Sequence, residues 1–184
     1  MACTNYTLQS FAEICGSIKG GITGLVLDGS SNAKQKLQPN FTDGSYAPVD
    51  ATSAVSQSDF VNGLVPFKTI NKYASGVESA GTFADATNTN YVTTTLTMTF
   101  NGIEDVAKFD NLRVARPVIY YRDGLNKWFV FGYFGTARAV SSTLTTGQQM
   151  TDATNRVLQF AEDSLYSPVA LDDATADWLG DLVD

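Results

Sequence analysis

The sequence predicts a mainly β (α+β) protein, a sandwich or barrel with two or three short helices. Most segments after residue 60 alternate apolar and polar side chains with a period of two, which is typical of half-buried strands. The apolar runs are rich in β-branched and aromatic residues and are bounded by turn sequences. Only 17% of the residues are charged, and Thr, Ser, Gly and Asn make up much of the rest. We expect roughly seven or eight strands.

The N-terminal segment, residues 1–21, precedes the β-rich part of the chain. A short helix is expected over residues 7–18, because apolar residues recur there at helical spacing. These residues are Leu8, Phe11, Ala12, Cys15 and Ile18. Gly20-Gly21 ends the helix, and the sequence ITGLVLDG then predicts a strand that finishes at Asp28-Gly29. A main domain is expected over residues 22–168.

Residues 29–58 differ from the rest of this domain. They are rich in Ser, Asn, Gln, Asp, Pro and Ala and show no period. A loop of this length within a domain is uncommon and usually has a function. We expect an arm that orders against a neighbouring subunit, with Phe41, Tyr46 and Val49 as its apolar anchors. On this hypothesis, removing residues 31–55 leaves the fold intact.

The next strands lead to the clearest β signal in the chain. Pro66 indicates an edge strand or a bulge within Phe60–Lys72, and Lys72–Ala80 is expected to form another strand. In YVTTTLTMTF, residues 91–100, one face carries Leu96, Met98 and Phe100. The opposite face carries four threonines and is expected to be wet. These are Thr93, Thr95, Thr97 and Thr99.

The remaining elements follow in order. A short helix is predicted near residues 103–115, and the Leu96 face is expected to pack against it. A hairpin with the turn DGLN follows, then a long polar strand from Thr136, and then the strand RVLQFAED. The hairpin is apolar on both faces, so we expect it to be central and covered on both sides. An outward aromatic platform for sugars is the alternative.

The C-terminal region, residues 169–184, is predicted to be an acidic tail with a terminal helix whose apolar face is Trp178, Leu179, Leu182 and Val183. The net charge of the chain is −7, and the acidic residues after Arg156, where there is no Lys or Arg, account for all of this negative charge. A neutral body with an acidic end lacks the basic face that direct nucleic-acid binding needs.

The residue types needed for common catalytic and metal sites are scarce. The chain has no histidine and only two cysteines, Cys3 and Cys15, which excludes histidine-dependent triads and a structural zinc site. The cysteines are expected to be free thiols, with a bridge between them as the alternative. We expect no enzymatic activity, no cofactor and no metal. No apolar run is long enough to span a membrane, and a cytoplasmic origin is expected.

A set of short motifs resembles one family in its order along the chain. It comprises CGSIKGGITGLVLDG, YVTTTLTMTF, IEDVAKFDNLRVA, PVIYYRDGLNKWFVFGY and STLTTGQQMTDATNRVLQFAEDSLYSP. Together they resemble the tail tube proteins of bacteriophages, in the form found in phages of Bacteroidota. Asn155-Arg156 stands where the family usually has Asn-Gly, and the acidic end is longer than in the family.

The resemblance implies a structural virion protein with a tail-tube β-sandwich or barrel. Its copies would form hexameric or dodecameric rings that stack into a channel, with DNA only as passing cargo and other tail or neck proteins as partners. The threonine face would then line the lumen, and the protein would be made in the bacterial host cytoplasm and reside in the virion tail. The alternatives are a head–tail connector or capsid decoration protein, and a glycan- or receptor-binding β-module.

Overall fold

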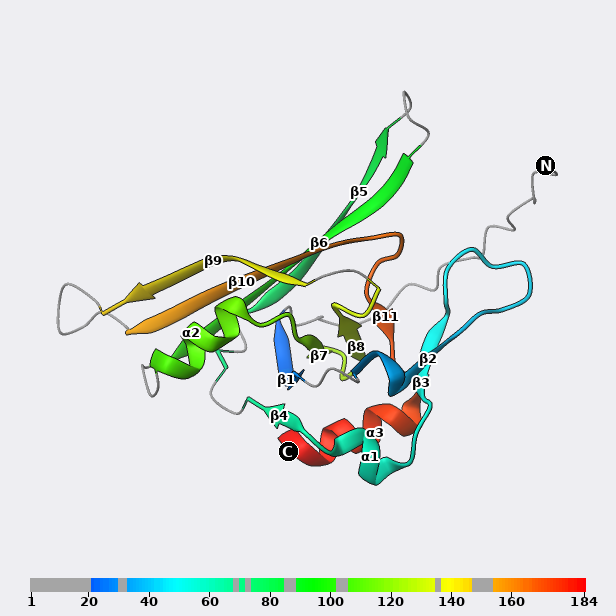
Figure 1. Cartoon of the computed structure of the whole chain (residues 1–184), viewed down its shortest axis with the longest axis horizontal. Coiled ribbons are helices and arrows are strands. Elements are labelled where there is room, and N and C mark those ends of the chain that lie inside the picture. Colours follow the sequence, from blue (N-terminus) through cyan, green and yellow to red (C-terminus); the bar gives the residue numbers. More distant parts are fainter. Residues whose placement is uncertain are drawn as a thin grey trace.

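Two antiparallel sheets pack face to face, and a separate two-stranded hairpin lies beside them (Figure 1). The first sheet has the strand order β11-β8-β7-β1-β4, and the second has the order β5-β6-β10-β9. This computed structural model describes residues 21–29, 33–67, 70–71, 74–84, 89–101, 106–134, 137–146 and 154–184. Three short α-helices occur within these ranges. The predicted class, mainly β with short helices, is confirmed.

The first sheet is covered on both faces. Its strands are β1 (Ile22–Asp28), β4 (Leu64–Pro66), β7 (Val118–Asp123), β8 (Trp128–Phe131) and β11 (Val169–Ala170). In β1 the successive residues Leu25, Val26 and Leu27 are all buried, as in a strand with protein on either side. β4 lies at the sheet edge, which agrees with the first of the two alternatives indicated by Pro66, an edge strand or a bulge.

The β7–β8 hairpin is the pair predicted around the DGLN turn. One Asp123 carboxylate oxygen accepts hydrogen bonds from the backbone N–H groups of Leu125 (2.8 Å) and Lys127 (2.9 Å). Asn126 has a φ of 64°, a left-handed conformation that asparagine tolerates better than most residues. The side chain of Asp123 therefore adds two hydrogen bonds to the backbone bond that Asp123 N–H donates to the carbonyl oxygen of Lys127 (2.9 Å), and together they stabilise the turn.

The second sheet is formed by longer strands, β5 (Gly76–Ala84), β6 (Thr89–Asn101), β9 (Arg138–Thr145) and β10 (Asn155–Ser164). In β6, Leu96 and Met98 are 0% exposed and Phe100 is 1% exposed, so the predicted apolar face is confirmed. This face packs mainly against the first sheet. α2 (Val106–Val114) joins the same core through Leu112. The expected helix thus contributes to the cover of this face, and the first sheet, which the expectation did not include, provides most of it.

A second core lies on the other face of the first sheet. There, Tyr120 and Val130 pack with Phe60 of α1 (Gln57–Val61) and Leu179 of α3 (Asp173–Val183). The predicted terminal helix and its apolar face are confirmed. This acidic region also contributes to the packing, because β11 pairs with β8 and Leu179 is 0% exposed. The C-terminal region of the described chain is thus part of the core.

Residues 33–58 are more ordered than a long loop. They contain the 3-10 helix η1 (Ala33–Gln35) and the hairpin strands β2 (Leu37–Asn40) and β3 (Asp50–Ser53). Leu37 and Ala51 are buried in the second core. Because removal of residues 31–55 would take away both buried residues, the structure predicts a loss of stability where the sequence predicted an intact fold. Short strands with Pro, Asn and Asp carry too little periodicity to be predicted.

Several predictions fall outside the described residues. The helix over residues 7–18, Cys3 and Cys15, and most of the turn that joins β5 to β6 belong to this group. Within the described ranges, no helix combines the length and the apolar character that crossing a membrane requires.

Candidate functional site

The polar face of β6 is the first candidate surface. Thr93, Thr95 and Thr97 are partly exposed, as expected. Thr99 is only 5% exposed, and its hydroxyl donates to the carbonyl oxygen of Ala74 at 2.8 Å. The prediction that Thr99 is wet is therefore wrong. Whether the other three threonines line a channel stays a prediction.

Neighbouring strands extend this polar face. Gln159 of β10 lies opposite Thr97 and donates to its hydroxyl at 3.3 Å, and Thr93 donates to the carboxylate of Asp163 at 2.7 Å. Gly76 of β5 has no side chain, and a shallow depression of 320 Å³ opens there over Thr97 and Gln159. The face therefore presents mostly hydroxyl and amide groups.

The charges on this face are few and mixed. Arg138 of β9 lies 3.6 Å from the Asp163 carboxylate, and both side chains are about half exposed. An exposed pair of this kind contributes at most about 1 kcal/mol to stability. Glu78 of β5 lies opposite Thr95. Among the described residues, this face shows no basic cluster that could hold phosphate. The sequence predicted the face only through the threonines of β6.

The edge strand β9 is the second candidate surface. Within the described residues it pairs only with β10, and all its residues except Ala139 are exposed. Val140 is 50% exposed and Leu144 is 45% exposed. Figure 1 shows this strand along the outer margin of the second sheet. A long exposed edge with apolar side chains is a template for pairing with another chain.

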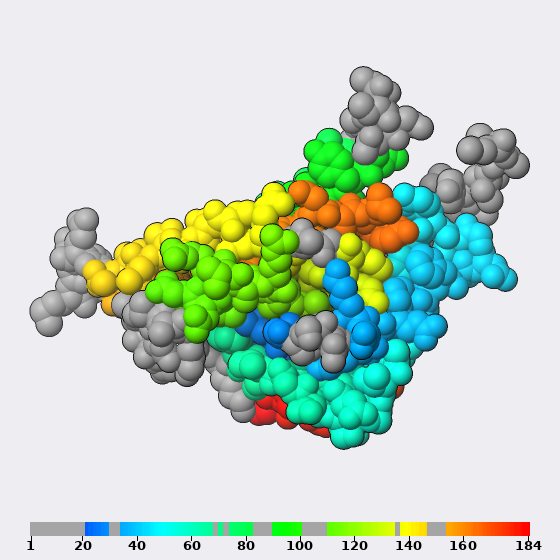
Figure 2. Space-filling model, in the orientation of Figure 1, coloured from blue at the N-terminus to red at the C-terminus, as the bar shows by residue number. Residues whose placement is uncertain are grey.

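The tip of the β2–β3 hairpin is the third candidate surface. Phe41, Tyr46 and Val49 are 54%, 56% and 56% exposed, and Figure 2 shows this hairpin, in cyan, projecting from the right side of the molecule. The ring of Tyr46 packs on that of Tyr166, with 5.7 Å between the ring centroids, and the centroids of the Tyr166 and Phe134 rings are 5.3 Å apart. These rings hold one side of the tip to the body. The expected contact of the tip with a neighbouring subunit stays a prediction.

The aromatic residues of the β7–β8 hairpin are mostly buried. Tyr120 and Phe131 are 0% exposed, and Trp128 is 3% exposed. This confirms the central, two-sided hairpin. The partly exposed rings near Tyr166 meet edge to face, a geometry that packs rings together and does not align them as a flat stacking platform.

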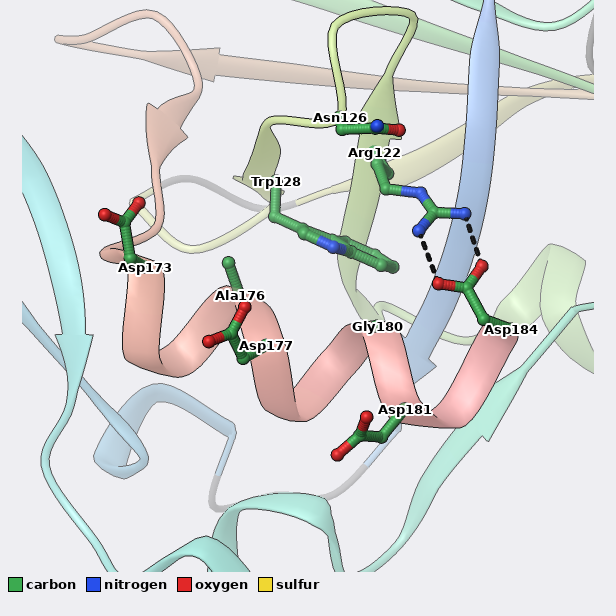
Figure 3. Close-up of a pocket in the computed structure, with 9 residues that line it drawn as sticks. All are labelled: Arg122, Asn126, Trp128, Asp173, Ala176, Asp177, Gly180, Asp181 and Asp184. Carbon is green, nitrogen blue, oxygen red and sulfur yellow. Dashed lines mark hydrogen bonds and ion pairs between the residues drawn. The ribbon is translucent and has the colours of Figure 1, made fainter.

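A groove lies between α3 and the β7–β8 hairpin (Figure 3). Its volume is 620 Å³, and an ion pair between two of its lining residues lies at one end (Figure 3). The two guanidinium N–H₂ groups of Arg122 donate to the two carboxylate oxygens of Asp184, at 2.8 and 3.0 Å. The same guanidinium lies 5.6 Å from the ring centre of Trp128, and its Nε donates to Thr23 at 3.1 Å.

The helix side of this groove is acidic. Asp173, Asp177 and Asp181 follow one another at intervals of four residues, so they share one face of α3, and all three are exposed. Because Arg122 is neutralised by Asp184, the groove disfavours anions. The sequence showed the acidic excess, and the four-residue spacing was the signal for a common face. In the parts of the chain that the structure describes, no three His, Cys, Asp or Glu side chains are placed to hold a metal ion.

Two buried tyrosines carry the clearest electrostatic perturbation. Burial raises the pKa of Tyr120 above its usual value, and the nearby Asp28 carboxylate raises it further. Burial likewise raises the pKa of Tyr121, with Asp123 as the second cause. Both phenols lie inside the protein and stay protonated, so they act as structural groups.

No family model, curated protein or solved structure matches the chain. The functional inference therefore depends on the surfaces described above and on the motifs of the sequence.

Proposed function

We propose that the protein is a structural virion protein, a subunit of a bacteriophage tail tube or a tube-like tail ring that forms a channel for DNA. The observation that carries the proposal is the adjacency of two surfaces on one sheet. The face around Thr95 and Thr97 is polar and weakly charged, and β9 leaves an exposed edge at the side of the same sheet.

In this proposal, a ring closes through the two outer strands of the second sheet, as the described residues form it. In the strand order β5-β6-β10-β9, β5 and β9 are the outermost strands. Pairing of β9 in one copy with β5 in the next continues the sheet, and repetition of this contact around an axis closes a ring. A closed barrel also removes the exposed edges, which are otherwise sites of aggregation.

The polar face suits the inner wall of such a ring. DNA carries a dense negative charge, and a wall with many Lys or Arg residues would retain it through phosphate contacts. Hydroxyl and amide groups, with Arg138 already paired to Asp163, offer no such retention. The exposed hairpin tip around Phe41 and Tyr46 would bridge stacked rings, and other tail or neck proteins would cap them.

Negative-stain microscopy and light scattering of the purified protein test the proposal. We expect hexameric or dodecameric rings or tubes. Val140→Lys places a charge on the proposed interface and should give folded monomers, because edge lysines oppose strand pairing. Leu165→Lys is the matched control, since Leu165 is 58% exposed and lies outside the β9 edge, and it should still form rings.

A stable monomer at high concentration, with no order even beside other virion components, would contradict the proposal. Rings that form equally well in the Val140→Lys variant would contradict the proposed edge contact. Single rings without stacking would favour a head–tail connector or a neck ring over a tube. No observation favours the glycan-binding alternative, because the hairpin aromatics are buried in the cores.

A further inference from the structure

The groove between α3 and the β7–β8 hairpin carries negative charge that its own residues do not neutralise. Among the described residues, the side chains of Asp173, Asp177 and Asp181, which line the groove, form no hydrogen bond or ion pair. Arg122 lines the groove as well, but it is already paired with Asp184 at 2.8 Å. The charge of the groove therefore favours a ligand with several positive charges.

The three aspartates are placed against the local stability of α3. Carboxylates four residues apart on a helix repel each other, and the sequence of α3, DATADWLGDLV, contains no Lys or Arg to offset the repulsion. Asp181 lies in the last turn, where the helix dipole disfavours an acidic side chain. A cationic ligand in the groove would offset both effects.

A second observation, independent of these charges, comes from Trp128. Its side chain is only 3% exposed and lines the groove, and Figure 3 shows the indole ring extending over α3 into this space. Among the described residues, the indole N–H donates no hydrogen bond. A donor that is largely removed from water is costly without an acceptor. The groove therefore also calls for a hydrogen-bond acceptor on the ligand.

The two requirements together select the chemistry of the ligand. In the described chain, no three acidic side chains lie close enough to hold one metal ion. A protonated polyamine supplies positive charges but no acceptor, because ammonium groups only donate. A peptide segment with Lys or Arg residues supplies both, since its backbone carbonyl oxygens accept hydrogen bonds. A volume of 620 Å³ has room for several side chains.

The spacing of the aspartates indicates the conformation of that segment. Positions four residues apart on a helix are separated by about 6 Å along its axis. In an extended chain, alternate side chains point to the same side and are about 6.6 Å apart. An extended segment also leaves backbone carbonyl oxygens available for the indole N–H, whereas a helix uses them internally.

We propose that the α3 groove binds an extended basic segment of a different protein. Lys or Arg residues at alternate positions of this segment face the three aspartates, and one of its backbone carbonyl oxygens accepts from the indole N–H of Trp128. A second copy of the chain does not supply such a segment. Lys34 and Lys36 are its one pair of basic residues two positions apart, and Lys36 is 7% exposed and paired with Asp28. The inference does not depend on ring formation.

Two synthetic peptides of the same composition test the spacing. Both are capped at their ends and contain equal numbers of Lys and Ser, in strict alternation in one peptide and with the Lys residues in one block in the other. Binding of the dye-labelled peptides to the full-length protein is measured by fluorescence anisotropy at low ionic strength. We expect the alternating peptide to bind about threefold or more tightly than the block peptide, and added salt should weaken its binding.

Substitutions in the groove locate the site. Asp177→Asn combined with Asp181→Asn should weaken binding of the alternating peptide about tenfold without destabilising the fold, because the repulsion within α3 falls. Gly180→Leu should block binding sterically, since a side chain added there first meets Asp184 Oδ2 at 4.0 Å and extends into the groove. Asp43→Asn is the matched control, because Asp43 is exposed outside the groove, and it should leave binding unchanged.

The contribution of the indole N–H is measured with Trp128→Phe, which keeps an aromatic ring and removes the donor. It should weaken binding about threefold to tenfold, and urea unfolding shows whether the variant is folded. If it does not fold, the substitutions at Asp177, Asp181 and Gly180 still decide the question. Equal affinity of the two peptides, or affinity that the paired Asp→Asn variant leaves unchanged, would overturn the proposal. Spermine that competes as strongly as the alternating peptide would also overturn it, because the groove would then hold cations without needing a peptide.

Discussion

Replacing Lys36 by methionine tests whether the base of the β2–β3 hairpin belongs to the core. The Lys36 ammonium lies 3.1 Å from the Asp28 carboxylate and donates to the carbonyl oxygens of Phe60 at 3.3 Å and Asn62 at 2.9 Å. Lys36 is 7% exposed and Asp28 is 1% exposed. One buried cation thus connects β1, the root of the hairpin and the end of α1.

The expected cost follows from what the substitution leaves behind. Removing one partner of a buried ion pair typically costs about 3–5 kcal/mol, because the other charge stays in a poorly solvated site. We therefore expect Lys36→Met to lower the free energy of unfolding by about 3–5 kcal/mol. Adding Asp28→Asn should recover part of this loss, because no full charge then remains at the site.

Equilibrium unfolding in urea measures these changes, at a protein concentration low enough to keep assembly from adding to the stability. Lys34→Met is the matched control, since the Lys34 side chain is exposed, and it should change the stability by no more than about 0.5 kcal/mol. If Lys36→Met were as mild as Lys34→Met, the hairpin base would not be part of the core and the reasoning would fail.

Four further predictions concern strand β6, the tip of the β2–β3 hairpin and the buried tyrosines. Leu96→Ala should lower the free energy of unfolding in urea by about 2–5 kcal/mol, because the side chain is fully buried, whereas Thr97→Val should have little effect. The reverse result would mean that the Thr97 side chain faces the core and the Leu96 side chain does not. Thr97→Lys should still give rings by microscopy but should slow DNA passage and reduce infectivity, because a ring repeats the added positive charge in every subunit; unchanged infectivity would contradict a lumen position. Replacing residues 42–48 by a short glycine linker should change the free energy of unfolding by less than about 1 kcal/mol, since these positions are mostly exposed. The same variant should form fewer stacked rings, as measured by sedimentation, and loss of folding would instead place the tip in the core. Tyr120 and Tyr121 have a raised pKa in the folded state, so the stability that they contribute is present below about pH 10, the ordinary tyrosine value, and declines as the pH rises above it. The absorbance of their phenolates should therefore appear only together with unfolding, and titration of these phenols with the fold intact would refute their burial.

The elements that the sequence predicted best have strong local signals. The alternation of Leu96, Met98 and Phe100 needs no knowledge of the partner strand, because successive side chains of any strand point to opposite faces. The same holds for the hairpin with its Asp123 turn and for the helical spacing of Leu179 and its neighbours. The β2–β3 hairpin was missed because its short strands carry no such period.

Among the candidate surfaces, the sequence identified the threonine face of β6 and the apolar tip residues of the hairpin. It did not identify the burial of Thr99, since Ala74 and Ser75, which cover it, lie about 25 residues away in the chain. The groove under α3 was also missed as a site, because Arg122 and Asp184 meet only when the helix packs on the first sheet.

The sequence by itself determined the class of the fold, the direction of the apolar faces and the acidic C-terminal end, since these follow from backbone geometry and from residue type. Tertiary structure alone decided which faces are covered and which of the described strands lie at the edges of the sheets. The place of β9 at the edge of the second sheet, as the described residues form it, and the buried pairing of Lys36 with Asp28 both depend on the distance between separate elements. Those distances are set by how the two sheets and α3 pack, which no local pattern contains.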